Sequence, residues 1–213
     1  TMKTRIISLC LLFLSVAMYG QKTYLHCGKL IDTETKKILQ NKTIIVESNK
    51  IISVEDGFVN TKNVTDKIID LRSKTVMPGL IDMHVHLEMQ TSPTKYIERY
   101  TNNPADRAFK AAKYAKTTLK AGFTTVRDLG GSGVNIALRK AINKGTAVGP
   151  RIFTAGKAIG TTGGHADPTN GSSIALMGDP GPKEGVINSV SDARKAVRQR
   201  YKNGADLIKI TAT

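Results

Sequence analysis

The stretch PGLIDMHVH at residues 78–86 decides the fold that this sequence predicts, because the pattern of the chain changes there. Side chains at positions i and i+2 of a β-strand point to the same face, so Asp82, His84 and His86 are expected on one side of a strand. Imidazole nitrogens ligate Zn²⁺ and related metals, and two of them on a rigid strand supply half of a metal site. Histidines at this spacing also arise by chance, so the surrounding sequence must show whether they form a metal site.

Short β-branched runs separated by turns extend from Tyr24 to Met77, before this stretch. The expected strands are residues 43–47, 50–54, 68–71 and 74–77. Ser48 and Asn49 stand between the first two, which predicts a hairpin. No helical period appears before about residue 92. The pattern predicts a partial β-sandwich over residues 21–78.

Strands alternate with helices after Gly79, which is typical of a parallel sheet with right-handed crossovers. The expected strands are residues 80–87, 123–126, 151–155 and 205–211. The expected helices are residues 106–120, 134–144 and 192–203, the last one capped by Ser191 and ended by Gly204. The glycine-rich segment 156–185 is expected to be a functional loop at one end of the sheet. The fold class is therefore α/β.

Lys209 interrupts the apolar run of the strand expected at residues 205–211. A parallel sheet buries such a strand on both faces, and a buried ammonium is costly unless it is paired or chemically altered. Two interpretations follow. The Lys209 ammonium is paired or chemically altered, or its side chain extends from the strand end to solvent.

Residues 78–86 resemble the first-strand signature of the amidohydrolase superfamily, which builds a metal site inside a (β/α)8 barrel. Residues 124–131 are similar to its second strand and loop, 149–152 to its third strand, and 162–167 to the loop after that. Together these motifs resemble the imidazolonepropionase-like branch, which includes prolidase-type (Xaa-Pro dipeptidase-like) enzymes.

The resemblance implies a set of roles for individual residues. His84 and His86 would hold one of two Zn²⁺ ions, and Lys209 would react with CO2 to form a carbamate that bridges both metals. His165 would contact the substrate, although an exposed loop histidine fits the sequence as well. Asp82 would orient a metal ligand, or be a buried hydrogen-bonding residue.

The implied reaction is hydrolysis of an amide-type C–N bond by a metal-activated water. The substrate would be a small molecule or a short peptide, either a dipeptide or a cyclic amide. At the end of the second strand, Arg127 and Asp128 either line the pocket or form an ion pair, and the ion pair is the better interpretation.

The length of the chain limits what the resemblance implies. A closed barrel takes about 250 residues by itself, more than the whole chain of 213. The resembled enzymes also use two further histidines from the fifth and sixth strands and an aspartate from the eighth. Residues 79–213 are therefore expected to be the N-terminal half of a barrel, truncated after its fourth strand and inactive as this fragment.

Residues 1–20 have the pattern of a secretory signal peptide, with Lys3 and Arg5 before an apolar run of about a dozen residues. Cleavage is expected after Ala17 or Gly20. The run is short for a stable membrane anchor, which needs about 20 apolar residues. The sequence thus predicts an exported protein, periplasmic or secreted. Removal of this segment takes away both bases and no acid, so the net charge falls from +15 to +13.

Two other classes of function compete with the hydrolase. The positive charge fits a basic module that binds anionic polymers, and a half-barrel without catalytic activity is the other alternative. Dispersed lysines and an aromatic content of 5% disfavour a nucleic-acid partner. A homo-oligomer of the full-length protein is left open.

Overall fold

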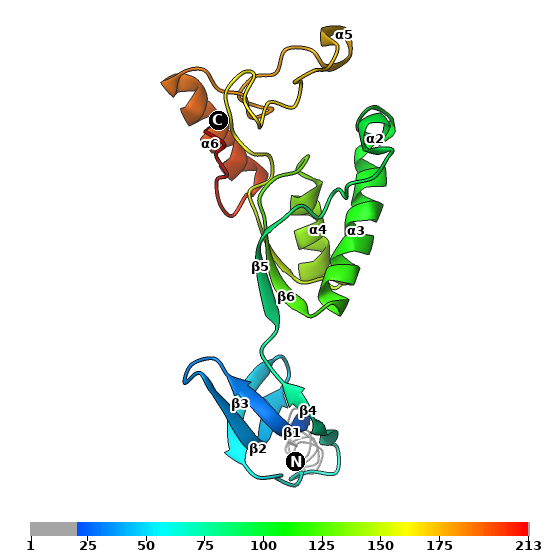
Figure 1. Cartoon of the computed structure of the whole chain (residues 1–213), viewed down its shortest axis with the longest axis vertical. Helices are drawn as coiled ribbons and strands as arrows, with labels where there is room; N and C mark the ends of the chain where they lie inside the picture. Colours follow the sequence, from blue (N-terminus) through cyan, green and yellow to red (C-terminus); the bar gives the residue numbers. More distant parts are fainter. Residues whose placement is uncertain (1–20, 213) are drawn as a thin grey trace, which may run out of the picture. The chain divides into compact units, whose positions relative to one another are not determined.

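The computed structural model describes residues 21–212, in two compact units that divide between Pro78 and Gly79 (Figure 1). The signal peptide predicted over residues 1–20 lies outside the described residues. Within residues 21–212, none of the helices is both long enough and apolar enough to cross a membrane.

The first unit is a four-stranded mixed sheet in the order β3-β2-β1-β4. Its strands are β1 (Lys22–Asp32), β2 (Lys37–Glu47), β3 (Lys50–Asp56) and β4 (Lys67–Val76). The predicted hairpin is confirmed, since β2 and β3 are antiparallel and Ser48 between them has a φ of 56°. The two strands expected over residues 68–77 form one strand, β4, which pairs in parallel with β1. Among the described residues of this unit, the region predicted as a partial β-sandwich therefore contains a single sheet.

Cys27, Leu30 and Ile44 form the buried core of this sheet. Burial raises the pKa of the Cys27 thiol, against the opposing effect of a backbone hydrogen bond with Ile44. His26 is also buried, and its Nε2 lies 2.9 Å from the carbonyl oxygen of Val59. These side chains stabilise the sheet.

The second unit contains a parallel sheet in the order β5-β6-β7, as the strand–helix alternation predicted. Its strands are β5 (Leu80–Val85), β6 (Phe123–Asp128) and β7 (Arg151–Thr154). Its helices are α2 (Lys95–Thr101), α3 (Pro104–Lys120), α4 (Val134–Asn143), α5 (Ile174–Met177) and α6 (Val190–Asn203). Helices α3 and α4 lie side by side and pack on the sheet, α3 against β6 and α4 against β7 (Figure 1).

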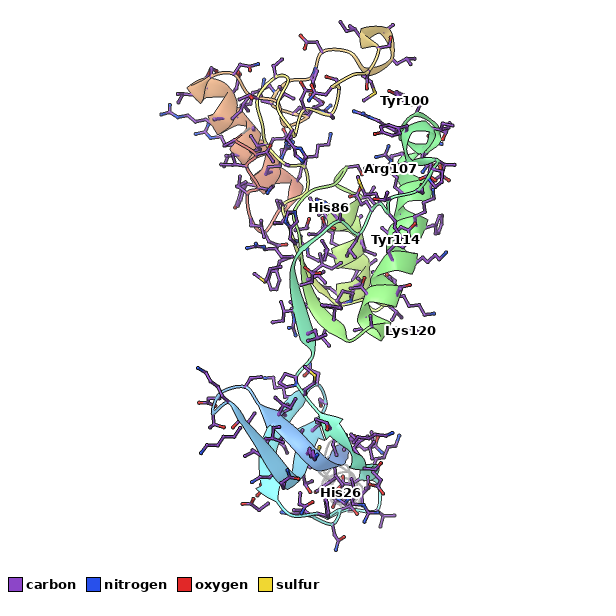
Figure 2. The ribbon with its side chains drawn as sticks, viewed as in Figure 1. His26, His86, Tyr100, Arg107, Tyr114 and Lys120 are labelled. Carbon is purple, nitrogen blue, oxygen red and sulfur yellow. The ribbon has the colours of Figure 1, made fainter. Side chains whose placement is uncertain are left out.

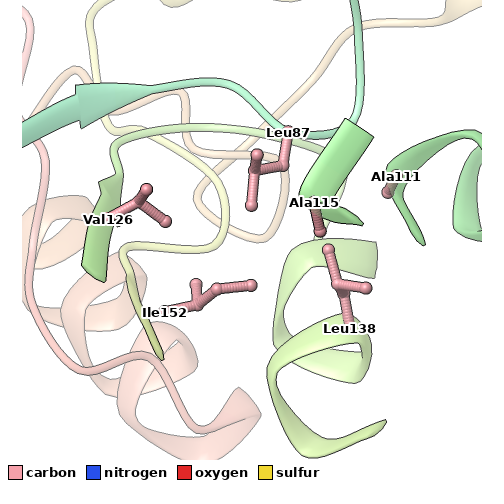
Figure 3. Packing of buried hydrophobic residues seen from close by; sticks show 6 residues of the cluster. All are labelled: Leu87, Ala111, Ala115, Val126, Leu138 and Ile152. Carbon is pink, nitrogen blue, oxygen red and sulfur yellow. The ribbon is translucent and has the colours of Figure 1, made fainter. Parts of the chain in front are cut away.

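Apolar side chains between these helices and the sheet make the core of the second unit (Figure 3). Its members are Leu87, Ala111, Ala115, Val126, Leu138 and Ile152. Ala111 and Ala115 lie on the helical face predicted from the sequence and are fully buried. Helix α3 begins at Pro104 with a capping box between Asn103 and Asp106, which satisfies backbone groups that the first turn leaves free.

The fourth strand expected at residues 205–211 is not formed. This segment has one isolated parallel bridge, between Ile210 and Ile159. The reason lies in its neighbour: β7 ends at Thr154, and Gly156 with a φ of 65° turns the chain away from the sheet. The backbone beside the segment is therefore interrupted, and a continuous ladder of hydrogen bonds cannot form.

The cap of α6 also differs from the prediction. Ser189, and not Ser191, is the N-cap residue, and its side chain accepts a hydrogen bond of 3.1 Å from the backbone N–H of Asp192. The predicted end of the helix is confirmed, because Gly204 is the C-cap with a φ of 89°.

Candidate metal centre

His84 and His86 lie at the carboxyl end of β5, the edge of a parallel sheet where ligands of α/β proteins usually bind. Figure 2 labels His86 at this position. Their ring centroids are 5.3 Å apart, with an angle of 65° between the ring planes. Both side chains are exposed. The two imidazoles that the sequence singled out are therefore neighbours, and both are accessible to a metal ion.

One hydrogen bond defines the chemistry of His86. Its Nδ1 lies 2.9 Å from the carbonyl oxygen of Gly130. A carbonyl oxygen only accepts hydrogen bonds, so Nδ1 must carry the proton and donate it. The lone pair of the neutral ring then resides on Nε2, the atom available to a metal. Metal-binding histidines in proteins typically make this kind of bond with their other ring nitrogen.

Asp82 makes a hydrogen bond with the backbone of this strand, and within residues 21–212 no hydrogen bond joins its carboxylate to either imidazole ring. Its Oδ1 accepts a hydrogen bond of 2.9 Å from the backbone N–H of His84. The pairing of β5 with β6 also shifts register between Asp82 and Val85. Strict alternation therefore fails across this part of β5, and spacing alone does not place Asp82 on the face of His84. The predicted role of Asp82 in orienting a metal ligand stays a prediction.

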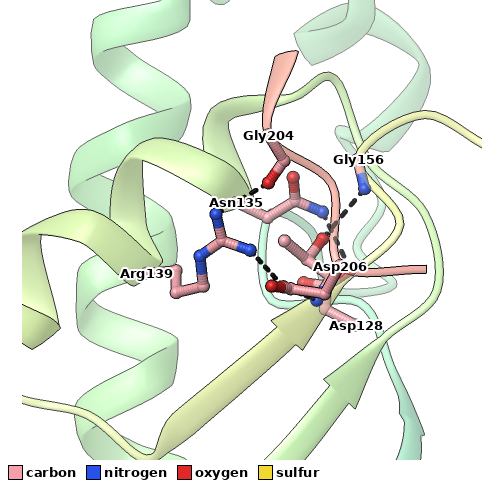
Figure 4. Close-up of polar contacts among 7 residues, drawn as sticks. Asp128, Asn135, Arg139, Gly156, Gly204 and Asp206 are labelled. Atoms are coloured by element: carbon pink, nitrogen blue, oxygen red, sulfur yellow. Dashed lines mark hydrogen bonds and ion pairs between the residues drawn. The ribbon is translucent and has the colours of Figure 1, made fainter. Parts of the chain in front are cut away.

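Asp128, at the end of β6, is fully buried beside the histidine strand. Its Oδ2 accepts a hydrogen bond from the backbone N–H of Leu87 at 3.1 Å, and its Oδ1 accepts one from that of Gly130 at 3.3 Å. Asn135 of α4 adds a third, from Nδ2 to Oδ1 at 3.0 Å (Figure 4). Burial raises the pKa of Asp128, while these three donors act in the opposite direction.

The ion pair between Arg127 and Asp128 that the sequence favoured is not formed, since adjacent residues of a strand point to opposite faces. The Nε of Arg127 instead donates a hydrogen bond of 2.7 Å to the carbonyl oxygen of Met83. This bond ties β6 to β5 on the face opposite to Asp128.

Glu88 is a second buried carboxylate that sequence reasoning missed. It accepts hydrogen bonds from the backbone N–H groups of Ser132 at 2.7 Å and Asn135 at 2.8 Å. Both donors lie at the start of α4, where free N–H groups and the helix dipole favour a negative charge. A sequence signal for Glu88 was its position directly after the strand predicted over residues 80–87.

Lys209 is partly buried in the irregular segment after α6. Its carbonyl oxygen accepts a hydrogen bond of 2.8 Å from the N–H of Ile159, whose own carbonyl accepts one of 2.8 Å from Thr211. These two bonds form the bridge that fixes the backbone on either side of Ile210. The carbamate on Lys209 stays a prediction.

His165 lies exposed in the loop that follows β7. Its neighbour Asp167 organises the loop, accepting hydrogen bonds from the N–H of Gly163 at 2.9 Å and from Oγ1 of Thr169 at 2.7 Å. Burial acts to raise the pKa of Asp167, but the bonds from Thr169 and Gly163 outweigh it and the pKa is lowered. The contact of His165 with a substrate stays a prediction.

Arg200 of α6 fastens both ends of this loop. It is 1% exposed, its Nε donates to the carbonyl oxygen of Lys157 at 2.8 Å, and its Nη1 donates to that of Lys183 at 3.2 Å. The loop is therefore held closed at its base.

The donor set of the described residues fits half of a zinc site. Two neighbouring imidazoles at the end of one strand match the preference of Zn²⁺, and His86 has its Nε2 available. Residues 21–212 contain no group of three or more His, Cys, Asp or Glu side chains placed to hold a metal. Two surface hollows, of about 370 and 650 Å³, lie along α6 and beside α3 and α4, and none of the predicted site residues lines them.

The profile of the Amidohydrolase family matches residues 75–213, which is more than half of the chain. This chain belongs to the amidohydrolase family. The match begins at the end of β4 and covers the whole second unit, with His84, His86, His165 and Lys209 inside it.

Relatives with solved structures have the same fold as this amidohydrolase chain. A Xaa-Pro dipeptidase crystallised with methionine in its active site is 45% identical, with a TM-score of 0.81, and the match covers 89% of this chain and 47% of that one. A prolidase in complex with N-methylphosphonate-L-proline is 32% identical, with a TM-score of 0.76 and coverage of 89% and 46%. The predicted resemblance and the α/β fold class are thereby confirmed.

Ochratoxinase from Aspergillus niger is 31% identical over 209 residues, covering 90% of this chain and 42% of that protein. The chain thus spans less than half the length of the relatives it matches. These neighbours support a hydrolase.

Proposed function

We propose that this chain is part of a metal-dependent hydrolase that cleaves an amide-type C–N bond with a metal-activated water. The observation that carries the proposal is the bond from His86 Nδ1 to the Gly130 carbonyl, which leaves Nε2 free beside the ring of His84. Membership of the amidohydrolase family supports the same reaction class. The proposal concerns the whole protein, because the chain spans less than half the length of its relatives.

His84 and His86 would hold one of two metal ions, with Zn²⁺ as the metal that suits their nitrogens. Bound there, the metal would polarise the substrate carbonyl and acidify a water molecule. Lys209 would become a ligand only after modification: its neutral Nζ amine forms an N–C bond with CO2, one C–O π bond of CO2 opens to give the carboxylate, and one N–H proton passes to solvent. The anionic carbamate that results could bridge two cations, which an ammonium cannot do.

Dipeptides are the proposed substrates, and those with a C-terminal proline are the first to test. The support is the likeness to a Xaa-Pro dipeptidase and a prolidase. His165 would contact the substrate from the loop that Asp167 organises. A cyclic amide is the alternative substrate. Export to the periplasm or the medium belongs to the same proposal, supported by the basic start and apolar run of residues 1–20.

The test is metal analysis of the protein expressed from its whole reading frame, together with release of proline from Xaa-Pro dipeptides. About two Zn²⁺ per chain are expected, since a carbamate bridges a metal pair. His84→Ala and Lys209→Ala should each lose metal and activity. Lys202→Ala is the matched control, because Lys202 is an exposed lysine of α6, and it should keep both.

The competing module for anionic polymers makes the opposite prediction. Basic side chains follow one another along the exposed face of α6, and they are Arg194, Lys195, Arg198 and Lys202. A protein without metal that binds DNA tightly, with an affinity that falls steeply as salt rises, would overturn the hydrolase proposal.

A further inference from the structure

We propose that Asp128 is a positioning residue for the metal site, and that its buried carboxylate fixes the tautomer and orientation of His86 through the backbone on both sides of that ring. The inference rests on the proposed function in one respect, namely that His86 ligates a metal. Nothing in the chemistry of Asp128 requires it to touch the metal or the substrate.

Asp128 is bonded to the two backbone segments between which the His86 ring is held. One oxygen accepts from Leu87, the residue directly after His86, and the other accepts from Gly130, whose carbonyl receives the Nδ1 proton. A single side chain therefore sets the position of the ring's own strand and of its hydrogen-bond partner. With no exposed surface, Asp128 has no water to replace either bond.

The Gly130 carbonyl is also fixed from its other side. The next residue, Gly131, lies against Glu88: a Cβ atom there would be 2.5 Å from Glu88 Oε1 and 3.0 Å from Asn135 Nδ2. Glu88 in turn is held by the backbone N–H of Ser132. The carbonyl that orients His86 thus lies between two points, each anchored by a buried carboxylate.

Asn135 joins these two carboxylates at the first turn of α4. Its backbone N–H donates to Glu88 and its side-chain Nδ2 donates to Asp128. Its Oδ1 is buried and has no partner among the described residues. Burying a carbonyl oxygen without a hydrogen-bond partner is unfavourable. The hydrogen bond that Nδ2 donates to Asp128 offsets this cost and thereby maintains the orientation of the amide.

The proton position on an imidazole is set by the hydrogen bond that its other nitrogen makes. With Gly130 in place, His86 presents Nε2 as the unprotonated nitrogen. If the Gly130 carbonyl shifts, the ring can redistribute its proton and point Nε2–H at the metal position. Partners behind a metal ligand typically change metal affinity by about 10–100-fold.

The first experiment is a long-range ¹H–¹⁵N correlation spectrum of the metal-free 213-residue chain, recorded about two pH units above the ordinary histidine pKa. His86 is expected to carry its proton on Nδ1. Asp128→Asn and Asn135→Ala should each shift it towards a mixture with the Nε2–H form. Asp70→Asn, at an exposed aspartate of the first unit, should change nothing. Amide spectra of each variant report whether the fold is kept.

A His86 tautomer that is unchanged in both folded variants would overturn the inference. The second measurement separates this result from the fate of the proposed function: Zn²⁺ alone is titrated into the same variants of the protein expressed from its whole reading frame. Weakening by about 10–100-fold in Asp128→Asn supports the positioning role. A tautomer that shifts in the 213-residue chain, while the protein from the whole reading frame does not bind Zn²⁺, would support the positioning role and count against the hydrolase.

Discussion

The two parts of the candidate site are built in different ways. The His86 corner, residues 84–88 with 128–135, combines a parallel strand pair with two buried carboxylates. The Lys209 segment, residues 205–211, has one isolated bridge and one partly exposed carboxylate. Many tertiary contacts within the described residues position the side chains of the His86 corner. Only a few such contacts position the Lys209 segment. The described fold therefore orients His86 by its own contacts, and it holds Lys209 much less firmly.

Asp206 anchors the Lys209 segment to the rest of the second unit (Figure 4). It accepts a hydrogen bond of 2.9 Å from the N–H of Thr154 and pairs with Arg139, which also donates to the carbonyl of Gly204 at 2.7 Å. The carboxylate thus joins the end of β7, helix α4 and the segment. Its role resembles that of Asp128 in the His86 corner, but its side chain is 32% exposed.

Gly131→Ala should break the His86 corner and have the largest effect on stability. The new Cβ would be 2.5 Å from a buried Glu88 oxygen, so the carboxylate or the backbone must move. Overpacking of this kind costs about 3 kcal/mol at the upper end of its usual range. Urea unfolding measures the loss. Gly181→Ala is the matched control, because a Cβ there meets no atom within 4 Å, and an equal loss in both variants would contradict the explanation.

Asp206→Ala should release the Lys209 segment while the His86 corner stays intact. Hydrogen bonds to charged groups contribute about 2 kcal/mol, and partial exposure places the expected loss at or below that value. Amide hydrogen exchange at Ile159 and Thr211 should become faster, since these two N–H groups make the bridge. Asp70→Ala removes the exposed ion pair with Arg72 and serves as the control. Unchanged exchange in the first variant would show that the bridge does not depend on Asp206.

The regular elements of both parts follow from sequence patterns. Hydrophobic period and punctuation by glycine predicted β5, β6, β7 and the helices between them, because these elements bury one face in one core. The apolar run at residues 205–211 gave the same signal but lacks a continuous neighbour. A β-strand forms only where a neighbouring backbone segment supplies its hydrogen bonds. A local sequence pattern does not show whether such a neighbour is present.

The candidate site was accessible to sequence reasoning only in part. His84 and His86 were found because their spacing is a local property of one strand. Glu88 was missed and Asp128 was assigned to an ion pair because their partners are distant in sequence: Leu87 is 41 residues from Asp128, and Asn135 is 47 from Glu88. Alternation along β6 did contain a signal, since it places Asp128 on the face of buried Val126.

Asp167→Asn should test the loop that packs against the Lys209 segment. The loop and the segment meet where Ala166 and Thr211 each come within 2.8 Å of the position that a Cβ of Gly160 would take. The pKa of Asp167 is lowered in the folded chain, so its ionised form adds stability above the ordinary carboxyl pKa, and this is lost as pH falls. At pH 7 the variant should lose about 1 kcal/mol.

The difference in unfolding free energy between Asp167→Asn and the unaltered chain should therefore shrink as the pH is lowered from about 6 to 3. Unfolding curves at several pH values measure it. A difference that stays constant over this range would mean that the negative charge of Asp167 does not stabilise the loop.

Ser189→Ala gives the smallest expected effect and separates the start of α6 from the segment at its end. Ser189 stands three residues before Asp192, the spacing of a capping box, and its Oγ accepts from the Asp192 N–H. Loss of an exposed N-cap costs about 0.5 kcal/mol at the lower end of measured values. Ser191→Ala is the matched control, because Ser191 was the cap that the sequence predicted and its Oγ makes a hydrogen bond of 2.8 Å with that of Ser189 and not with the backbone of the first turn. In thermal unfolding, Ser189→Ala should have a lower Tm than Ser191→Ala, and amide hydrogen exchange at Ile159 should be the same in both variants.

If amide hydrogen exchange at Ile159 becomes faster when the cap is lost, the Lys209 segment depends on the whole of α6 and not on Asp206 alone.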